Sequence, residues 1–206
     1  MKLVGMLDSP YVRRVAICLK LLKVQFEHQS LSVFSTFDEF RAINPVVKVP
    51  TLVLDDGQVL MDSCLILEYL GGLVTERSLW PQQSAARIRA TRLVGLALAA
   101  NEKAVQVVYE HKLRPAQKLH EPWLERVQMQ LFAALGELER ELTNEPLSTE
   151  QPALGQAEVS IAVAWSFTQL MSPLPLLVQA QEFPRLAAYA QALEQLPVFV
   201  DTPAVC

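Results

Sequence analysis

Two stretches of this sequence carry residues that are suited to hold a small peptide. Pro50 begins the strand-like run Thr51–Leu54, and a proline fits there only at the start of a strand because it has no N–H for the ladder. A cis peptide bond between Val49 and Pro50 would turn the chain at this point. The turn would leave the main-chain N–H and C=O of Val49 facing outward, where an extended peptide can bind.

The second stretch, Asp62-Ser63, precedes an apolar helical run. Asp62 can bind an ammonium group, while Ser63 and its N–H can bind a carboxylate at the start of the helix. Lys48, beside the exposed strand end, can pair with a second carboxylate. The same residues also fit an ordinary helix start and a solvated loop lysine, so the pattern leaves both interpretations open.

Ser9 precedes Pro10 at a further helix start, where serine is favoured as N-cap and proline as first helical residue. The unpaired N–H groups and the positive end of the helix dipole stabilise an anion at this place. A thiolate bound there would have a lowered pKa, and the Ser9 hydroxyl could donate a hydrogen bond to its sulfur. The alternative is that Ser9 serves only as a cap.

These residues fall within a β-α-β-α-β-β-α order followed by long helical patterns, which predicts a small open sheet covered by helices and then an all-helical bundle. The predicted domains are residues 1–75 and 85–206. We expect strands at 2–6, 26–30, 51–54 and 59–61, and helices from Pro10, at 37–43, at 63–70 with its end at Gly71-Gly72, and at 85–112, 123–142, 156–170 and 183–196.

Composition excludes several classes of function. The 206 residues carry a net charge of −4, which argues against nucleic acid as a partner, and no apolar run is long enough to predict a membrane span. The basic pair Arg13-Arg14 is expected on a solvated helix face. His28, His111 and His120 have no metal-ligand spacing, so no metal site is expected.

The 3 cysteines, Cys18, Cys64 and Cys206, are an odd number without a pairing pattern, which is typical of a reducing cytoplasm. Cys18 and Cys64 lie in apolar helical patterns and are expected to be buried and inert. Cys206 is terminal, and the sequence assigns it no role.

Taken together, the sequence resembles the cytosolic-type glutathione S-transferases, in particular bacterial members with a serine at the thiol-activating position. Three segments carry the resemblance: residues 9–15 (Ser-Pro-Tyr-Val-Arg-Arg-Val), Asn44-Pro45 through Leu52, and Asp62-Ser63 with Ile66 and Glu68-Tyr69-Leu70. The family combines a thioredoxin-like domain with a C-terminal helical bundle.

The resemblance implies a catalytic Ser9 and a glutathione site formed by Tyr11, Lys48, Val49, Asp62 and Ser63. It implies conjugation of glutathione, the co-substrate, to a small hydrophobic electrophile, without a metal. It also implies a cytoplasmic homodimer, which the apolar helix with Leu93, Leu96, Leu98 and Val105 could form unless those residues fill the bundle core. Asn101, Tyr109 and Glu110 would lie near the acceptor site or the dimer cleft.

Two departures from the family pattern matter. Glutaredoxin-type members have cysteine where this chain has Ser9, and serine cannot form a mixed disulfide. The sixth helix of the family usually begins with a Ser/Thr capping box, but Gly155 stands here without a side-chain acceptor. Glutathione-dependent peroxide or disulfide reduction, and a non-enzymatic partner-binding protein of this fold, remain the alternatives.

Overall fold

The structure, a computed structural model, describes residues 1–204 of the chain. They form two compact units, the first comprising Met1–Trp80 together with the segment from Leu196 onward, and the second Pro81–Gln195. The domain limits predicted from the sequence, 1–75 and 85–206, assign the C-terminal segment to the helical part. In the structure this segment instead packs with the first unit, where α9 (Pro197–Val200) contacts α1 (Pro10–Leu21).

A four-stranded mixed sheet with the order β2-β1-β3-β4 forms the centre of the first unit. Its strands are β1 (Lys2–Val4), β2 (Glu27–Gln29), β3 (Thr51–Val53) and β4 (Val59–Leu60). β1 pairs in parallel with β2 and antiparallel with β3, so Leu3 lies opposite both His28 and Leu52. The predicted β-α-β-α-β-β-α order and the antiparallel hairpin around Gly57 are confirmed.

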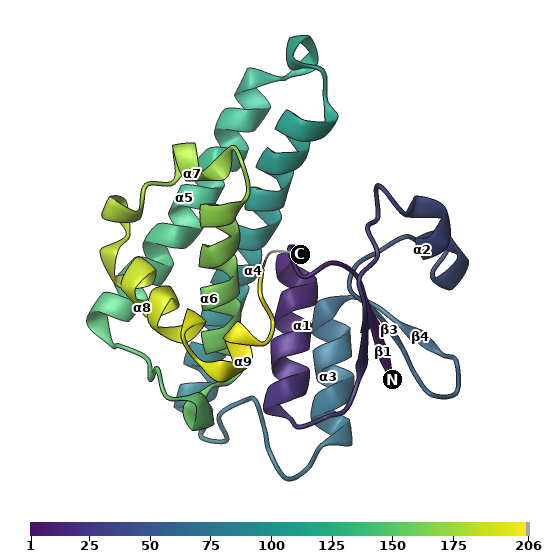
Figure 1. Cartoon of the computed structure of the whole chain (residues 1–206). Helices are drawn as coiled ribbons and strands as arrows, with labels where there is room; N and C mark the ends of the chain where they lie inside the picture. Colours follow the sequence, from purple (N-terminus) through teal and green to yellow (C-terminus); the bar gives the residue numbers. More distant parts are fainter. Residues whose placement is uncertain (205–206) are drawn as a thin grey trace. The chain divides into compact units, whose positions relative to one another are not determined.

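Helices cover both faces of this sheet. α1 packs against α3 (Ser63–Leu73) on one face, and α2 (Phe37–Ile43) lies on the opposite side (Figure 1). Phe40 of α2 is fully buried in a cluster with Val4 and Leu31, and Val49 packs against the edge of that cluster. The central strands β1 and β3 are therefore largely buried, whereas the edge strands β2 and β4 are partly exposed. The turn before β3 packs against the α2 side of the core.

The prediction for the end of α3 is wrong. The helix continues through Gly71 and Gly72 to Leu73, although each glycine costs about 1 kcal/mol relative to alanine inside a helix. The main-chain N–H of Val74 still donates to the carbonyl of Leu70, which closes the last turn. Tertiary packing therefore prevails over the local preference for a stop.

The second unit is all helical, as predicted. Its helices are α4 (Ser84–Leu113), α5 (Glu121–Asn144), α6 (Gln156–Leu170), α7 (Leu174–Leu177) and α8 (Pro184–Glu194), with 3₁₀ turns at Ala116–Lys118, Gln151–Ala153 and Ala180–Glu182. α6 is buried along most of its length, because α4 and α8 both pack against it. Gly155 is its N-cap; having no side chain, it cannot form a complete capping box, but its N–H donates to Glu158 Oε2 over 2.9 Å.

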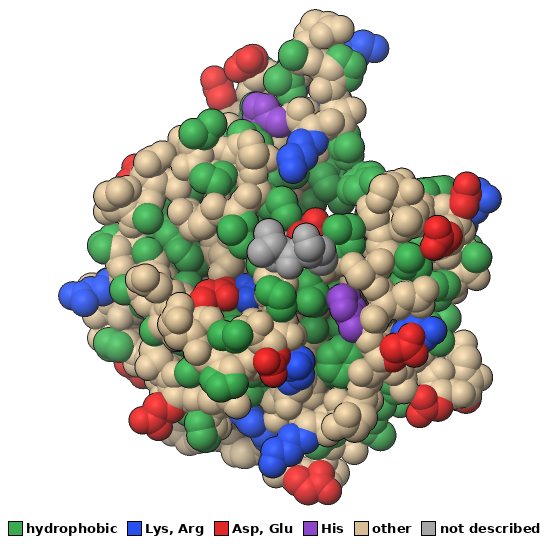
Figure 2. All heavy atoms as spheres, in the orientation of Figure 1, with side chains coloured by type: hydrophobic (Ala, Val, Ile, Leu, Met, Phe, Trp, Pro, Cys, Tyr) green, Lys and Arg blue, Asp and Glu red, His purple; other side chains and the backbone are tan. Residues whose placement is uncertain are grey.

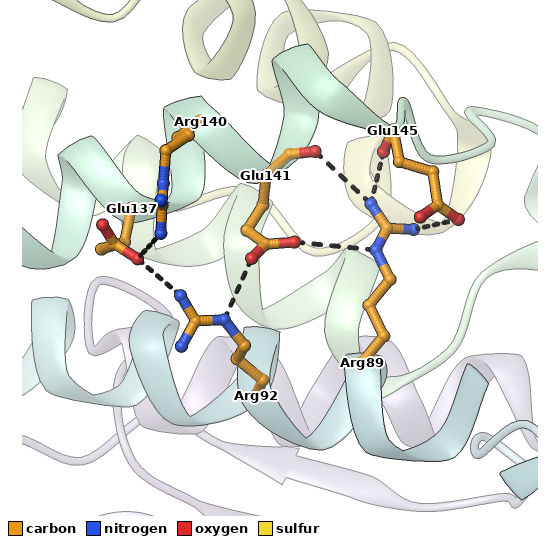
Figure 3. A network of polar contacts seen from close by, with 6 residues as sticks. All are labelled: Arg89, Arg92, Glu137, Arg140, Glu141 and Glu145. Carbon is orange, nitrogen blue, oxygen red and sulfur yellow. Dashed lines mark hydrogen bonds and ion pairs between the residues drawn. The ribbon is translucent and has the colours of Figure 1, made fainter. Parts of the chain in front are cut away.

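A network of ion pairs joins α4 to α5 (Figure 3). Arg92 lies 2.5 Å from Glu137 Oε2 and 3.0 Å from Glu141 Oε1, and Arg140 pairs with Glu137 one turn along α5. Hydrogen bonds from Arg140 and Arg92 lower the pKa of Glu137. The pair of Arg140 with Glu137 lies within α5, but most of the network runs between the two helices.

Acidic and basic side chains are interspersed on the face of the molecule shown in Figure 2, with hydrophobic side chains between them. In the described part of the chain, no helix combines the length and apolar character needed to cross a membrane.

Candidate functional site

Ser9 occupies the N-cap position of α1 and Pro10 is the first helical residue, as predicted. The Ser9 carbonyl accepts from the Arg13 N–H over 3.0 Å, but its hydroxyl makes no capping hydrogen bond. The side chain is half-buried. Because the cap does not use it, the hydroxyl at this positive helix end is available to a bound group.

The chain approaches Ser9 through Gly5, which has φ +135°, a conformation that residues with a side chain rarely adopt. A Cβ atom on Gly5 would lie 2.6 Å from Cγ2 of Val12 and 3.0 Å from Cγ1 of Val49. Gly5 therefore lets the end of β1, the first turns of α1 and the turn before β3 approach one another closely. This role of Gly5 was not predicted from the sequence; its signal there is a lone glycine between a strand and a helix start.

The peptide bond between Val49 and Pro50 is cis, which confirms the prediction. Val49 is half-buried, and neither its N–H nor its C=O has a main-chain hydrogen-bond partner within residues 1–204. The β3 ladder begins only at Thr51, opposite Val4. An extended peptide could therefore add its own main-chain hydrogen bonds at Val49, as in strand addition.

Buried polar side chains stabilise the turn before β3 that contains Val49. Asn44, which is 2% exposed, donates from Nδ2 to Thr51 Oγ1 over 2.9 Å, and Thr51 donates in turn to the Lys48 carbonyl over 2.6 Å. Lys48 itself is exposed. The same Nδ2 lies 3.3 Å from the sulfur of Met61, next to the start of α3. Asn44 is thus a positioning residue that was not predicted from the sequence.

Asp62 is the N-cap of α3, and its Oδ1 accepts from the N–H groups of Cys64 over 2.9 Å and Leu65 over 3.4 Å. The ordinary capping interpretation is therefore present in the structure. The carboxylate is nevertheless exposed, whereas Ser63 is only 2% exposed. The peptide bond between Met61 and Asp62 is cis as well.

The predicted solvated face at Arg13-Arg14 is wrong: the two residues are 2% and 1% exposed. Arg13 donates from Nε to the Thr202 carbonyl over 2.7 Å and lies over the Phe199 ring. Arg14 donates from Nη1 to Ser63 Oγ over 3.2 Å. Both charges are buried because they bind groups that lie 189 and 49 residues away in the sequence.

The expectation for the cysteines is only half right. Cys18 is buried, and burial raises the pKa of its thiol to about 12, so it is an inert core residue. Cys64 is exposed at the first turn of α3, with its sulfur 3.5 Å from Arg14 Nη1. Cys206 lies outside the described residues. No cluster of three or more histidine, cysteine or acidic residues that could hold a metal occurs in residues 1–204.

The structure brings Val49 close to the first turns of α1 through Gly5, and Ser63 close to α1 through Arg14. Tyr11 follows Ser9 in α1 and is half-buried. The residues implied for the acceptor site lie in the second unit. There, Asn101 is fully buried without a hydrogen-bond partner for its amide, Tyr109 is 42% exposed, and Glu110 pairs with Arg114.

Comparison with known proteins agrees with this arrangement. Residues 3–78 match the family model described as the N-terminal domain of glutathione S-transferase. The structure is similar, with a TM-score of 0.80 and 31% identity over 98% of both chains, to a glutathione transferase family member from Pseudomonas fluorescens Pf-5 with bound S-(propanoic acid)-glutathione.

Two curated bacterial proteins are also similar. The uncharacterized GST-like protein YibF of Escherichia coli K12 is 28% identical over 84% of this chain and 85% of its own length. Glutathione S-transferase GstA of Escherichia coli O157:H7 is 28% identical over 80% of this chain and 76% of its own length. Since the match to the Pseudomonas protein spans nearly the whole of both chains, this chain belongs to the glutathione S-transferase family.

Proposed function

We propose that the protein conjugates the glutathione thiolate to a small, hydrophobic electrophile. The observation that carries this proposal is the unpaired main chain of Val49, held beside the cis proline and close to the start of α1. In this arrangement Val49 pairs with the main chain of the cysteinyl residue of glutathione. The thiol then lies toward Ser9, whose hydroxyl donates to the thiolate, with Tyr11 beside it.

The charges near Val49 complement those of glutathione, which has one ammonium and two carboxylate groups. Asp62 binds the ammonium of the γ-glutamyl residue, and Ser63 binds its carboxylate at the N-terminus of α3. The exposed Lys48 pairs with the glycine carboxylate at the other end. Catalysis then consists of stabilising the thiolate and holding the two reactants together, without a metal.

Calorimetry with glutathione, followed by a conjugation assay with a panel of aromatic halides, epoxides and enones, tests this proposal. We expect glutathione to bind and at least one electrophile to be consumed with formation of a thioether. Lack of glutathione binding contradicts the proposal and favours a partner-binding protein without catalysis. Binding without any conjugation rejects the transferase assignment but leaves the glutathione site intact.

Reduction of peroxides or disulfides is the second candidate, and the exposure of Cys64 favours testing it. In the peroxidase reaction, two glutathione molecules are oxidised to their disulfide while one peroxide is reduced to an alcohol and water. Measuring glutathione disulfide in the wild type and in Cys64→Ala distinguishes this reaction from conjugation. Loss of disulfide production in the variant assigns the redox step to Cys64.

We also propose a homodimer in the cytoplasm. The predicted interface on α4 is partly wrong, because Leu93 is only 1% exposed and fills the bundle core. A better candidate is a face of α3 where Leu65, Tyr69 and Leu73, spaced four residues apart, are 58%, 38% and 50% exposed. Apolar side chains at this spacing form one helical stripe that a second copy can cover. A free, exposed Cys64 fits a reducing compartment.

A further inference from the structure

Arg14 joins two segments of the proposed site that lie far apart in the sequence. It belongs to α1, the helix that Ser9 caps, and its side chain is 1% exposed. Its Nη1 donates to the hydroxyl oxygen of Ser63, 49 residues away at the start of α3, over 3.2 Å. The same nitrogen lies 3.5 Å from the sulfur of Cys64. A buried guanidinium therefore lies directly beneath the first turn of α3.

This contact fixes the role of the Ser63 hydroxyl. A guanidinium carries only donors, so Ser63 Oγ must accept in this hydrogen bond. A hydroxyl has one proton, and that proton is therefore directed away from Arg14. It remains available for donation to another acceptor, such as a carboxylate. The buried positive charge also adds to the positive end of α3, where an anion is already stabilised.

We propose that Arg14 is a positioning residue that makes Ser63 a donor toward the γ-glutamyl carboxylate of glutathione. This inference rests on the proposed function, in which Ser63 binds that carboxylate. Arg14 does not itself touch the ligand. It acts by orienting the hydroxyl of Ser63 and by placing a positive charge behind it, so its effect is confined to ligands that carry the carboxylate.

The alternative is that Arg14 has only a structural role and holds α1 against α3. The chain offers a matched control for it in Arg13, which is 2% exposed and adjacent in the same helix. Arg13 donates to the carbonyl of Thr202 and lies over the ring of Phe199, both in the C-terminal segment. Replacing Arg13 therefore removes a guanidinium that is as buried as that of Arg14, but leaves the hydrogen bond to Ser63 in place.

The experiment compares the full-length wild type, Arg14→Met, Arg13→Met and Ser63→Ala by calorimetry with two ligands. One ligand is glutathione, and the other is its analogue in which 4-aminobutyrate replaces the γ-glutamyl residue and the carboxylate is missing. We expect Arg14→Met to weaken glutathione binding about tenfold, the size of one charge-assisted hydrogen bond, and to leave the analogue within about twofold. Arg13→Met should change both affinities by the same factor.

A second measurement tests the route through Ser63. In the Ser63→Ala background, Arg14→Met should weaken glutathione binding clearly less than in the wild type, because the hydroxyl that Arg14 orients is gone and only the effect of its charge remains. If Arg14→Met does not fold, Arg14→Lys takes its place, and the expected loss is again selective for glutathione. Equal losses for both ligands, or no loss at all, overturn the proposal. A wild type that binds neither ligand instead contradicts the proposed function.

Discussion

The side-chain amide of Asn44 donates a hydrogen bond to the hydroxyl of Thr51 over 2.9 Å, so that one buried residue spans the turn that contains Val49. The other end of the same amide accepts from the N–H of Val46 over 3.0 Å. The turn before the cis proline is therefore fixed from both sides. Its shape depends on a side chain that lies outside the proposed set of glutathione contacts.

Replacing Asn44 with alanine should lower the stability of the protein and weaken glutathione binding. The change leaves the buried Thr51 hydroxyl and the N–H of Val46 without the partner that Asn44 provides, and the loss at the buried hydroxyl costs about 1–3 kcal/mol. Urea unfolding measures the first effect and calorimetry the second. Asn144→Ala, at the exposed end of α5, is the control and should change neither. Equal behaviour of the two variants would show that Asn44 does not hold the turn.

Local signals in the sequence were sufficient where a helix or strand depends on its own residues. The limits of α2 (Phe37–Ile43) and α6 (Gln156–Leu170) agree with the prediction at both ends. Pro45 lies shortly after α2, and Gly155 is the N-cap of α6. A residue with a strong local preference therefore marks the end of α2 and the start of α6. The end of α3 was predicted wrongly because the local stop signal of Gly71-Gly72 is overridden by packing that no local pattern records.

The buried arginines show where prediction from the sequence fails. Hydropathy assigns a charged pair to solvent, yet Arg13 and Arg14 find partners 189 and 49 residues away. Such partners become visible only when the fold brings them together. The same holds for the contact of Gly5 with Val49. The residues proposed to touch glutathione were predicted from their types and order and from the family resemblance, whereas the residues that position them were not.

Gly5→Ala should destabilise the protein strongly. The new Cβ would meet Cγ2 of Val12 at 2.6 Å, and the backbone would have to keep φ +135°. We expect a loss of more than about 2 kcal/mol, from strain and overpacking together, because the branched side chain of Val12 cannot rotate away freely. Gly57→Ala isolates the backbone cost, since Gly57 has φ +85° with nothing within 4 Å. A Gly5 variant as stable as the Gly57 variant would refute the close approach.

The thiols should differ sharply in reactivity. In a Cys206→Ser background, Ellman's reagent at pH 8 should modify one thiol of the native protein and two after unfolding, and Cys64→Ser should remove the native reaction. Burial raises the pKa of Cys18 from 9.0 to about 12. This thiol stays neutral in the fold but ionises above pH 9 when unfolded, so its contribution to stability is full below pH 9 and is lost between pH 9 and 12. Rapid labelling of both thiols in the native state would contradict the burial.

The apolar face of α3 should hold two chains together. Light scattering during gel filtration should give twice the mass of one chain for the wild type, and Leu73→Glu should shift the protein to the monomer because it places a charge in an apolar interface. Leu176→Glu, on α7 with Leu176 79% exposed, is the control. A wild-type monomer, or a dimer unaffected by Leu73→Glu, would reject this face as the interface.

Ser9→Ala should raise the pKa of the glutathione thiol in the complex. The hydroxyl of Ser9 stabilises only the thiolate, so its removal favours the protonated thiol, by about 1–2 pKa units for a charge-assisted hydrogen bond. Because the thiolate is the nucleophile, kcat/KM increases as the thiol ionises. This increase should occur at a higher pH in the variant than in the wild type. The loss of rate should therefore be greatest below pH 7 and should shrink in alkaline solution. Ser9→Thr keeps the hydroxyl and should retain most of the wild-type profile. If the pH profile of Ser9→Ala equals that of the wild type, the thiolate is stabilised by the main-chain N–H groups at the start of α1, and Ser9 is only a helix cap.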